Sequence, residues 1–163
     1  MSSRPVEDIG SLLTLHDACG TATSAGVPIL TIAGATEDNV EVTGETIDRI
    51  DSSTGAMAMS AVLCTTYNAT LANTKTITFA HEYQLSADGS SWDTAVAIEA
   101  ATTEATGDGV STEFRGVSTF DLDLSAHKRY IRFNVTPNLS NTSTDAASWH
   151  TVAVLGGYNR IPV

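Results

Sequence analysis

Residues 76–86 constrain the fold more than any other stretch, because large side chains alternate there with smaller or more polar ones. Successive side chains of a β-strand point to opposite faces, so this alternation predicts a strand with one buried face. Residues 87–90 then form a turn, since Asp88 and Gly89 tolerate positive φ. The side chains expected on the buried face are Ile77, Phe79, His81, Tyr83 and Leu85.

Composition extends this prediction to the whole chain. The chain has 163 residues with 42% hydrophobic and 6% aromatic content, which is enough for one core. A domain of this size buries roughly 70% of its unfolded surface. Ser and Thr occur throughout, and Thr favours strands while Ser and Gly favour turns. We therefore predict an all-β protein, an antiparallel β-sandwich with jelly-roll-like topology, over residues 27–163.

The predicted organisation is an extended N-terminal arm over residues 1–26, followed by about eight or nine short strands. The arm carries one expected helical turn near residues 11–16. Residues 102–109 are expected to form an exposed acidic loop, and Pro137 to end a strand because it lacks an N–H. Besides 76–86, the expected strands are 27–33, 39–43, 46–51, 56–67, 95–100, 120–124, 129–136 and 149–155.

Charge excludes two classes of partner. The net charge is −11 with only 8 Lys and Arg residues. Binding of nucleic acid or of an anionic membrane needs clustered cations, so we expect neither. The N-terminus has no apolar core of a secretion signal, which predicts synthesis in the cytoplasm. In that compartment Cys19 and Cys64 are expected to be reduced, partly buried thiols, with a disulfide as the alternative.

Several groups have the residue types of a metal or ion-pair site. Asp121 and Asp123 share one strand face, and Lys128, Tyr130 and Arg132 share another. Antiparallel pairing of these two strands would give cross-strand ion pairs. The sharper alternative is a calcium site at Asp121 and Asp123, or at Asp48 and Asp51, but no calcium-loop spacing is present. His16 and Cys19 have the spacing of half a zinc site and no second pair completes it. We expect no metal and no cofactor.

Catalytic signatures are incomplete. Residues 116–120 begin like a nucleophile elbow around Ser118, but the final Gly is missing and a strand surrounds it. His81 falls on the buried face of its strand and is expected to be a hydrogen-bonded core histidine. These patterns predict a protein that is not an enzyme.

Two segments together resemble the head decoration, or cement, proteins of tailed bacteriophages, which are virion structural proteins. They are Tyr-Gln-Leu-Ser-Ala-Asp-Gly-Ser-Ser-Trp at 83–92 and Lys-Arg-Tyr-Ile-Arg-Phe-Asn-Val-Thr-Pro at 128–137, followed by residues 153–157. The resemblance implies a β-sandwich, often a homotrimer, that binds the major capsid protein on the capsid exterior and stabilises the shell. Docking is expected through one end of the sandwich and the arm, at Arg4, Val6, Ile9, Leu12 and Leu13.

The first segment alone also resembles discoidin-like modules of the galactose-binding fold. In those modules a Ser-Asp-Gly turn precedes a Trp, and an Arg-Tyr-aliphatic-Arg strand follows. This alternative implies binding of a carbohydrate or a surface by exposed aromatic side chains. Trp92 and Trp149 are the only large candidates, and we expect both to pack in the core.

Overall fold

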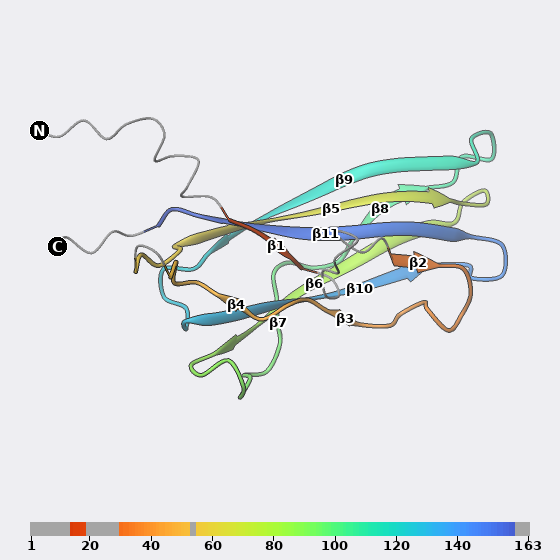
Figure 1. Ribbon diagram of the computed structural model, residues 1–163. Helices are drawn as coiled ribbons and strands as arrows, with labels where there is room; N and C mark the ends of the chain where they lie inside the picture. The colour runs from red at the N-terminus through yellow and green to blue at the C-terminus, as the bar shows by residue number, and fades with distance from the viewer. Residues whose placement is uncertain (1–13, 19–29, 53–54, 159–163) are drawn as a thin grey trace, which may run out of the picture.

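The computed structural model describes residues 14–18, 30–52 and 55–158, and these residues form two facing antiparallel sheets (Figure 1). The five-stranded sheet has the order β1-β11-β5-β9. β1 and β2 follow one another along the same edge of β11, and both pair with it. Its strands are β1 (Thr14–Asp17), β2 (Leu30–Ile32), β5 (Ser60–Thr70), β9 (Glu113–Asp123) and β11 (Ala146–Gly156).

The six-stranded sheet packs against the first. Its order is β3-β10-β6-β7, with β4 beside β3 on the edge of β10 and β8 beside β7 on the edge of β6. Its strands are β3 (Val42–Thr43), β4 (Ile47–Asp48), β6 (Thr76–Ser86), β7 (Val96–Ala97), β8 (Thr102–Thr106) and β10 (Tyr130–Leu139).

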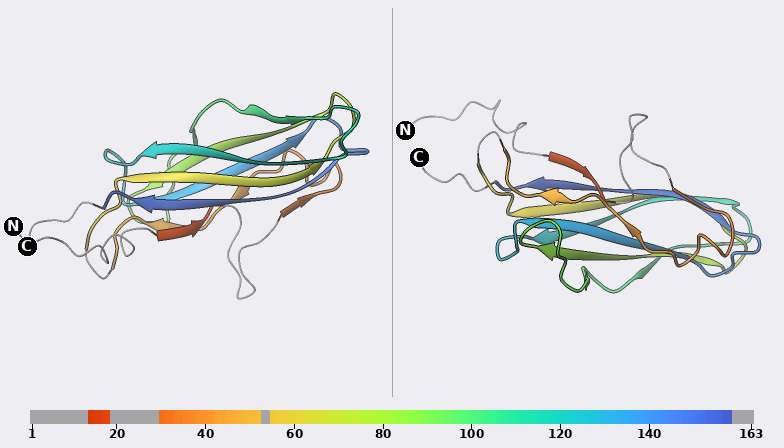
Figure 2. Two further views of the ribbon diagram at one scale, coloured as in Figure 1. Left: turned by 90° about the horizontal axis from the view of Figure 1, so that it is seen from above. Right: turned by 60° about the horizontal axis from the view of Figure 1, so that its bottom comes forward.

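The chain crosses repeatedly between the two layers, and this crossing defines a jelly roll (Figure 2). β5 lies in one sheet and β6 in the other, while β9, β10 and β11 alternate between sheets. Each pair of short strands, β1 with β2, β3 with β4 and β7 with β8, occupies the place of one long strand. The predicted all-β, jelly-roll-like sandwich is thus confirmed.

The core consists of two apolar clusters with a polar layer between them. One cluster surrounds Phe133 and Leu63, and the other surrounds Phe79 and Trp149. Between them the Thr65 hydroxyl lies 2.7 Å from His81 Nε2 and 2.7 Å from the Thr151 hydroxyl. His81 is 2% exposed and its ring lies 4.3 Å from that of Phe120. The expectation of a hydrogen-bonded core histidine is confirmed.

Three local predictions are wrong. The expected helical turn at residues 11–16 is wrong for Thr14–His16, because β1 pairs there with β11. The expected loop at 102–109 contains β8, which pairs with β6. β10 does not end at Pro137 but continues to Leu139. The carbonyl of Phe133 accepts from Gly44 N–H, so odd residues of β10 point their backbone polar groups away from β6. The N–H that Pro137 lacks would therefore not have paired with β6.

Gly116 lets Tyr67 bridge the two sheets. The two residues are cross-strand partners on the core face, and the Tyr67 hydroxyl donates to the Glu104 carbonyl of β8 at 2.9 Å. A Cβ at position 116 would lie 2.4 Å from the Tyr67 oxygen. The ring of Tyr67 cannot move aside without losing its bond to β8.

Gly116→Ala is therefore expected to lower the free energy of unfolding by about 2 kcal/mol, the range found for overpacked cores. Urea denaturation measures the change. Gly34→Ala is the control, because an added Cβ there meets nothing closer than 3.5 Å. Equal stability of the two variants would contradict the packing argument.

Candidate interaction surface

The five residues expected to dock the protein, Arg4, Val6, Ile9, Leu12 and Leu13, all lie outside the described residues. Their contacts remain a prediction. The structure instead presents a surface that the sequence interpretation did not single out, on the outer face of the five-stranded sheet.

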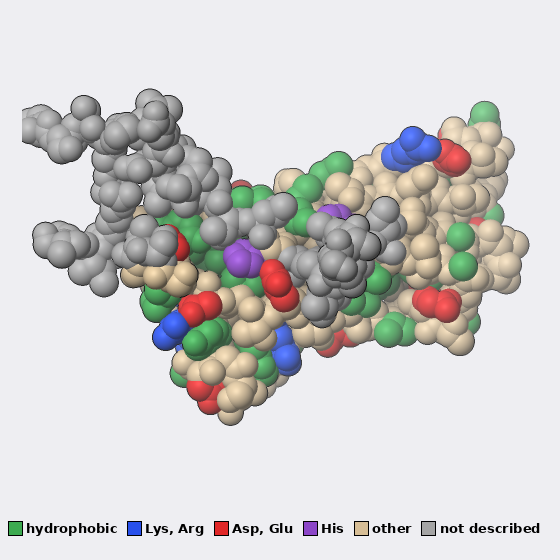
Figure 3. Space-filling view, in the orientation of Figure 1, with side chains coloured by type: hydrophobic (Ala, Val, Ile, Leu, Met, Phe, Trp, Pro, Cys, Tyr) green, Lys and Arg blue, Asp and Glu red, His purple; other side chains and the backbone are tan. Residues whose placement is uncertain are grey.

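The outer face of β5 and β11 carries no Asp, Glu, Lys or Arg. This is notable in a chain with 19 acidic residues. Val62 is 37% exposed on this face, although it is a large apolar side chain. In the space-filling view, the right-hand half of the visible surface is mostly uncharged, with basic and acidic side chains towards its margins (Figure 3). We call the outer face of β5 and β11 the uncharged face. It consists of Ser60, Val62, Cys64, Thr66, Asn68 and Thr70 of β5, and Ala146, Ser148, His150, Val152, Val154 and Gly156 of β11.

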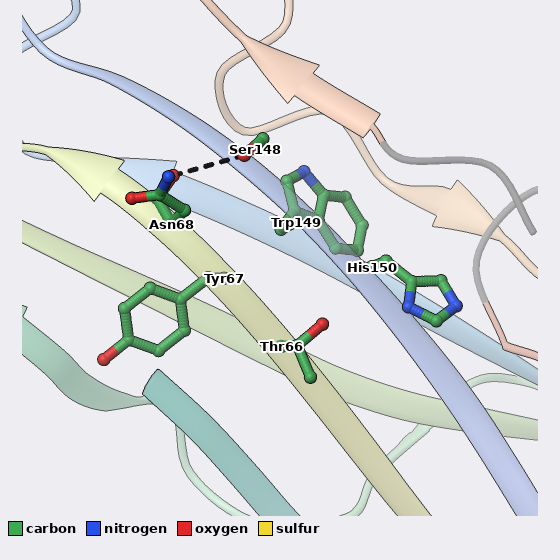
Figure 4. Close-up of a pocket in the computed structure, with 6 residues that line it drawn as sticks. All are labelled: Thr66, Tyr67, Asn68, Ser148, Trp149 and His150. Carbon is green, nitrogen blue, oxygen red and sulfur yellow. Dashed lines mark hydrogen bonds between the residues drawn. The ribbon is translucent and has the colours of Figure 1, made fainter. Parts of the chain in front are cut away.

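Two adjoining hollows mark the uncharged face between β5 and β11. One, of about 280 Å³, is lined by Thr66, Asn68, Ser148 and His150, with the buried residues Tyr67 and Trp149 at its base (Figure 4). The other, of about 270 Å³, shares Asn68 and Ser148 with it and extends to β2. Both are open to solvent, and hydroxyl and amide groups lie among apolar atoms in their lining, so they offer hydrogen bonds beside apolar surface.

A basic cluster lies at the end of the sandwich where β10 begins. Lys128 Nζ is 2.6 Å from Asp93, and Arg129 makes a two-pronged contact with Asp48. The hydrogen bond from Arg129 lowers the pKa of Asp48 below its ordinary value. The expected ion pairs of this segment with Asp121 and Asp123 are wrong, because β9 and β10 lie in different sheets and pair with different strands.

The two tryptophans have different environments. Trp149 is 2% exposed and belongs to the core, as expected. Trp92 does not: it is half-buried, and the Arg132 guanidinium lies 4.3 Å from its ring centre. Arg132 Nε also donates to Gln84 Oε1 at 2.8 Å. This stack fastens the segment after β6 to the outer face of the six-stranded sheet.

The candidate chemical groups do not converge in the described part of the chain. Ser118 donates to a carboxylate oxygen of Glu104, not to a histidine. His16 Nδ1 lies 2.9 Å from Glu45, and Cys19, its suggested zinc partner, lies outside the described residues. Within these residues no three His, Cys, Asp or Glu side chains are grouped to hold a metal ion. Cys64 is a free thiol on the uncharged face.

No helical segment in the described ranges has the length and apolar character needed to cross a bilayer.

Comparison with known proteins gives no family. No protein-family model matches the chain, and no curated sequence matches it. Among solved structures, infectious bursal disease virus, Gx strain, matches with a TM-score of 0.49 and 9% identity over 92% of this chain and 34% of that chain. The VP2 subviral particle of infectious bursal disease virus matches with a TM-score of 0.44 and 11% identity, over 88% and 32%.

A carbohydrate-binding domain is similar to the same degree. The CBM22-1 xylan-binding domain of Xyn10C from Paenibacillus barcinonensis has a TM-score of 0.38 and 8% identity, over 88% of this chain and 93% of that one. This chain spans about a third of the length of the two viral chains. TM-scores and sequence identities this low carry no argument about function, and the fold assignment rests on the sheet topology itself.

Proposed function

We propose that this protein is a non-enzymatic structural protein of a virion, a decoration protein that binds the outer surface of a tailed-phage capsid. It would be made in the host cytoplasm and would add to the assembled shell. The observation that carries the proposal is the uncharged face, which has no Asp, Glu, Lys or Arg in a strongly acidic molecule. Depletion of charged side chains is typical of the centre of a protein–protein interface.

The physical logic is that of a ligand present in many copies. A protein that binds only the assembled shell stabilises that shell by mass action. The partner would be the major capsid protein, whose neighbouring subunits together offer a surface that a single subunit does not. Self-association, as the homotrimer that the resemblance implies, would add avidity by engaging several subunits at once. The arm residues Arg4, Val6, Ile9, Leu12 and Leu13 would supply a second contact.

The test uses two matched substitutions on opposite sides of the sandwich. Val62→Asp places a charge on the uncharged face, whereas Val96→Asp does so on β7 of the other sheet, where Val96 is 48% exposed. Each protein is mixed with shells assembled from the major capsid protein of the same genome, and occupancy is measured by co-sedimentation. We expect Val62→Asp to lower occupancy at least tenfold, since a buried unpaired charge costs more than 1.4 kcal/mol, and Val96→Asp to leave it unchanged.

Two further outcomes separate the parts of the proposal. Deletion of residues 1–13, which leaves β1 intact, should also reduce shell occupancy, and unchanged occupancy would exclude the arm. Failure of the wild-type protein to bind shells would refute the capsid role. The hydroxyl- and amide-lined hollows favour a carbohydrate-binding module as the second candidate. A glycan-array signal lost on Asn68→Ala would support that candidate.

A further inference from the structure

Strand β9 leaves a long edge of the five-stranded sheet open. It has 11 residues and pairs with β5 on one side over its whole length. No strand in the described ranges pairs with its other side. The glutamate of β8 that contacts Ser118 belongs to the other sheet. Figure 1 shows β9 running along the upper margin of the molecule. An open edge of this length is a template for another strand.

Two backbone hydrogen bonds establish which groups of β9 face the open side. In an antiparallel ladder the N–H and C=O of one residue point to the same side, and those of the next residue point to the opposite side. Leu124 N–H donates to Met59 O at 2.9 Å, so even-numbered residues of β9 are directed at β5. Ala18 N–H donates to Thr151 O at 3.0 Å, so odd-numbered residues of β11 are directed at β1 and even-numbered ones at β5. The registers of β11 with β5 and of β5 with β9 then direct the even-numbered residues of β9 at β5, which is the same result. The odd-numbered residues of β9 therefore direct their backbone groups outward.

The side chains of these odd-numbered residues form a self-complementary sequence. Arg115 lies three residues before Ser118 and Asp121 lies three residues after it, while Val117 and Thr119 flank it directly. Val117 is 63% exposed, which its place beside an open strand edge explains. Arg115 contacts Glu113 at 2.9 Å, and both side chains are mostly exposed. Arg115 can therefore accept a second carboxylate.

We propose that a second copy of this chain pairs with β9 antiparallel, about a two-fold axis at Ser118. Each Val117 then lies opposite the partner's Thr119, and each Arg115 lies opposite the partner's Asp121. Both kinds of pair would exchange backbone hydrogen bonds, because all four residues have odd numbers. The two sheets would join into one continuous sheet, a common way for strand edges to associate.

Neighbouring registers are less favourable. An axis at Thr119 places Val117 opposite the partner's Asp121, an apolar side chain against a charge. An axis at Val117 places Glu113 opposite the partner's Asp121, and like charges directly opposite are destabilising. The axis at Ser118 also places Glu113 opposite the partner's Asp123, a like-charge pair, but unlike the axis at Val117 it places each Arg115 opposite a carboxylate of the partner, Asp121. A two-fold contact cannot close a trimer, so in a trimeric protein it would join one trimer to the next.

Thr119→Pro tests the pairing without breaking the fold. The N–H that proline removes points to the open edge, so the ladder with β5 keeps its bonds. Sedimentation equilibrium of the full chain should give a wild-type mass at least twice that of Thr119→Pro. Thr119→Ala keeps the N–H and should keep the wild-type mass. Equal masses for wild type and a folded Thr119→Pro protein, checked by circular dichroism, would overturn the proposal.

Charge exchange tests the register with variants that keep every backbone group. Arg115→Asp and Asp121→Arg each place like charges opposite one another and should halve the mass. The double variant restores two opposite-charge pairs and should recover the wild-type mass. A double variant that stays dissociated overturns the axis at Ser118. The inference is independent of the proposed capsid role, because sedimentation of the protein alone tests the pairing without any shells.

Discussion

Replacing Arg49 with methionine is expected to lower the free energy of unfolding by about 3 kcal/mol or more, the cost of removing one partner from a buried charged network. Arg49 is fully buried, and its five N–H donors make five hydrogen bonds, all to backbone carbonyls. They bind Ala58 before β5, and Leu124, His127 and Lys128 in the connection from β9 to β10. Burial lowers the pKa of Arg49, but the guanidinium stays charged at neutral pH.

The loss follows from the groups that Arg49 leaves behind. Methionine fills a similar volume without a donor, so the carbonyls of Ala58, His127 and Lys128 lose the guanidinium as a partner, while Leu124 O keeps the N–H of His127. Denaturation with guanidinium chloride measures the loss in free energy of unfolding. A loss of this size lowers Tm by roughly 6–12 °C in a domain of this length. Arg129→Met is the matched control, because Arg129 is an exposed neighbour whose ion pair with Asp48 is screened by solvent. Equal losses in the two variants would refute the role given to Arg49.

Acid is expected to destabilise the protein through His81. Burial lowers the pKa of His81 from 6.5 to about 4 in the folded protein. Between these values the unfolded chain binds a proton that the folded chain does not. The free energy of unfolding therefore falls as the pH falls from 6.5 towards 4, by about 3 kcal/mol over the whole window.

No charged group offsets the cost of protonating His81. The side chains around its ring are Thr65 and Thr151 in the five-stranded sheet, with Phe79 and Phe120. The His81→Gln side chain cannot titrate, so this variant should flatten the dependence of the free energy of unfolding on pH above about 4.5. At pH 7, where His81 is neutral, the substitution should change the free energy of unfolding by less than the whole pH window does in the wild type. His127→Gln is the control: burial also lowers the pKa of His127, but this side chain is only half-buried. If the free energy of unfolding of His81→Gln depends on pH as steeply as that of the wild type, His81 is not the acid-sensitive group.

The sequence interpretation located every long strand but not every boundary. β6 was predicted closely, because its alternation has a buried and a polar face. β9 begins at Glu113, well before the clear alternation from Phe120 onwards. Its first half carries Arg115, Gly116 and Val117, none of which marks a buried face by itself. Gly116 belongs in the strand because Tyr67 covers it from the neighbouring strand, a contact 49 residues away in sequence that no local pattern encodes.

The candidate surface was missed for a related reason. Every second residue of β5 and β11 is uncharged, and this signal is visible in the sequence. An uncharged run of this kind fits a strand buried on both faces equally well, because the local sequence does not show whether a second layer covers it. β5 does lie inside its sheet, between β11 and β9, but its outer face meets no second layer in the described residues. Whether a second layer covers this face is determined by the tertiary structure.

By itself the sequence determined the class of fold, the buried phase of β6 and β10, and the turn at Asp88 and Gly89, where Gly89 has a φ of 76°. These features depend on side chains within a few residues of one another, so a local pattern contains them. Only the tertiary structure decided which strands pair, which places β9 beside β5 and away from β10. It also decided that Arg49 is buried and that, among the described residues, the outer face of β5 and β11 carries no charge and β9 has one edge without a partner strand. Those properties arise from residues far apart in the chain, and their free energy exists only once the two sheets have packed.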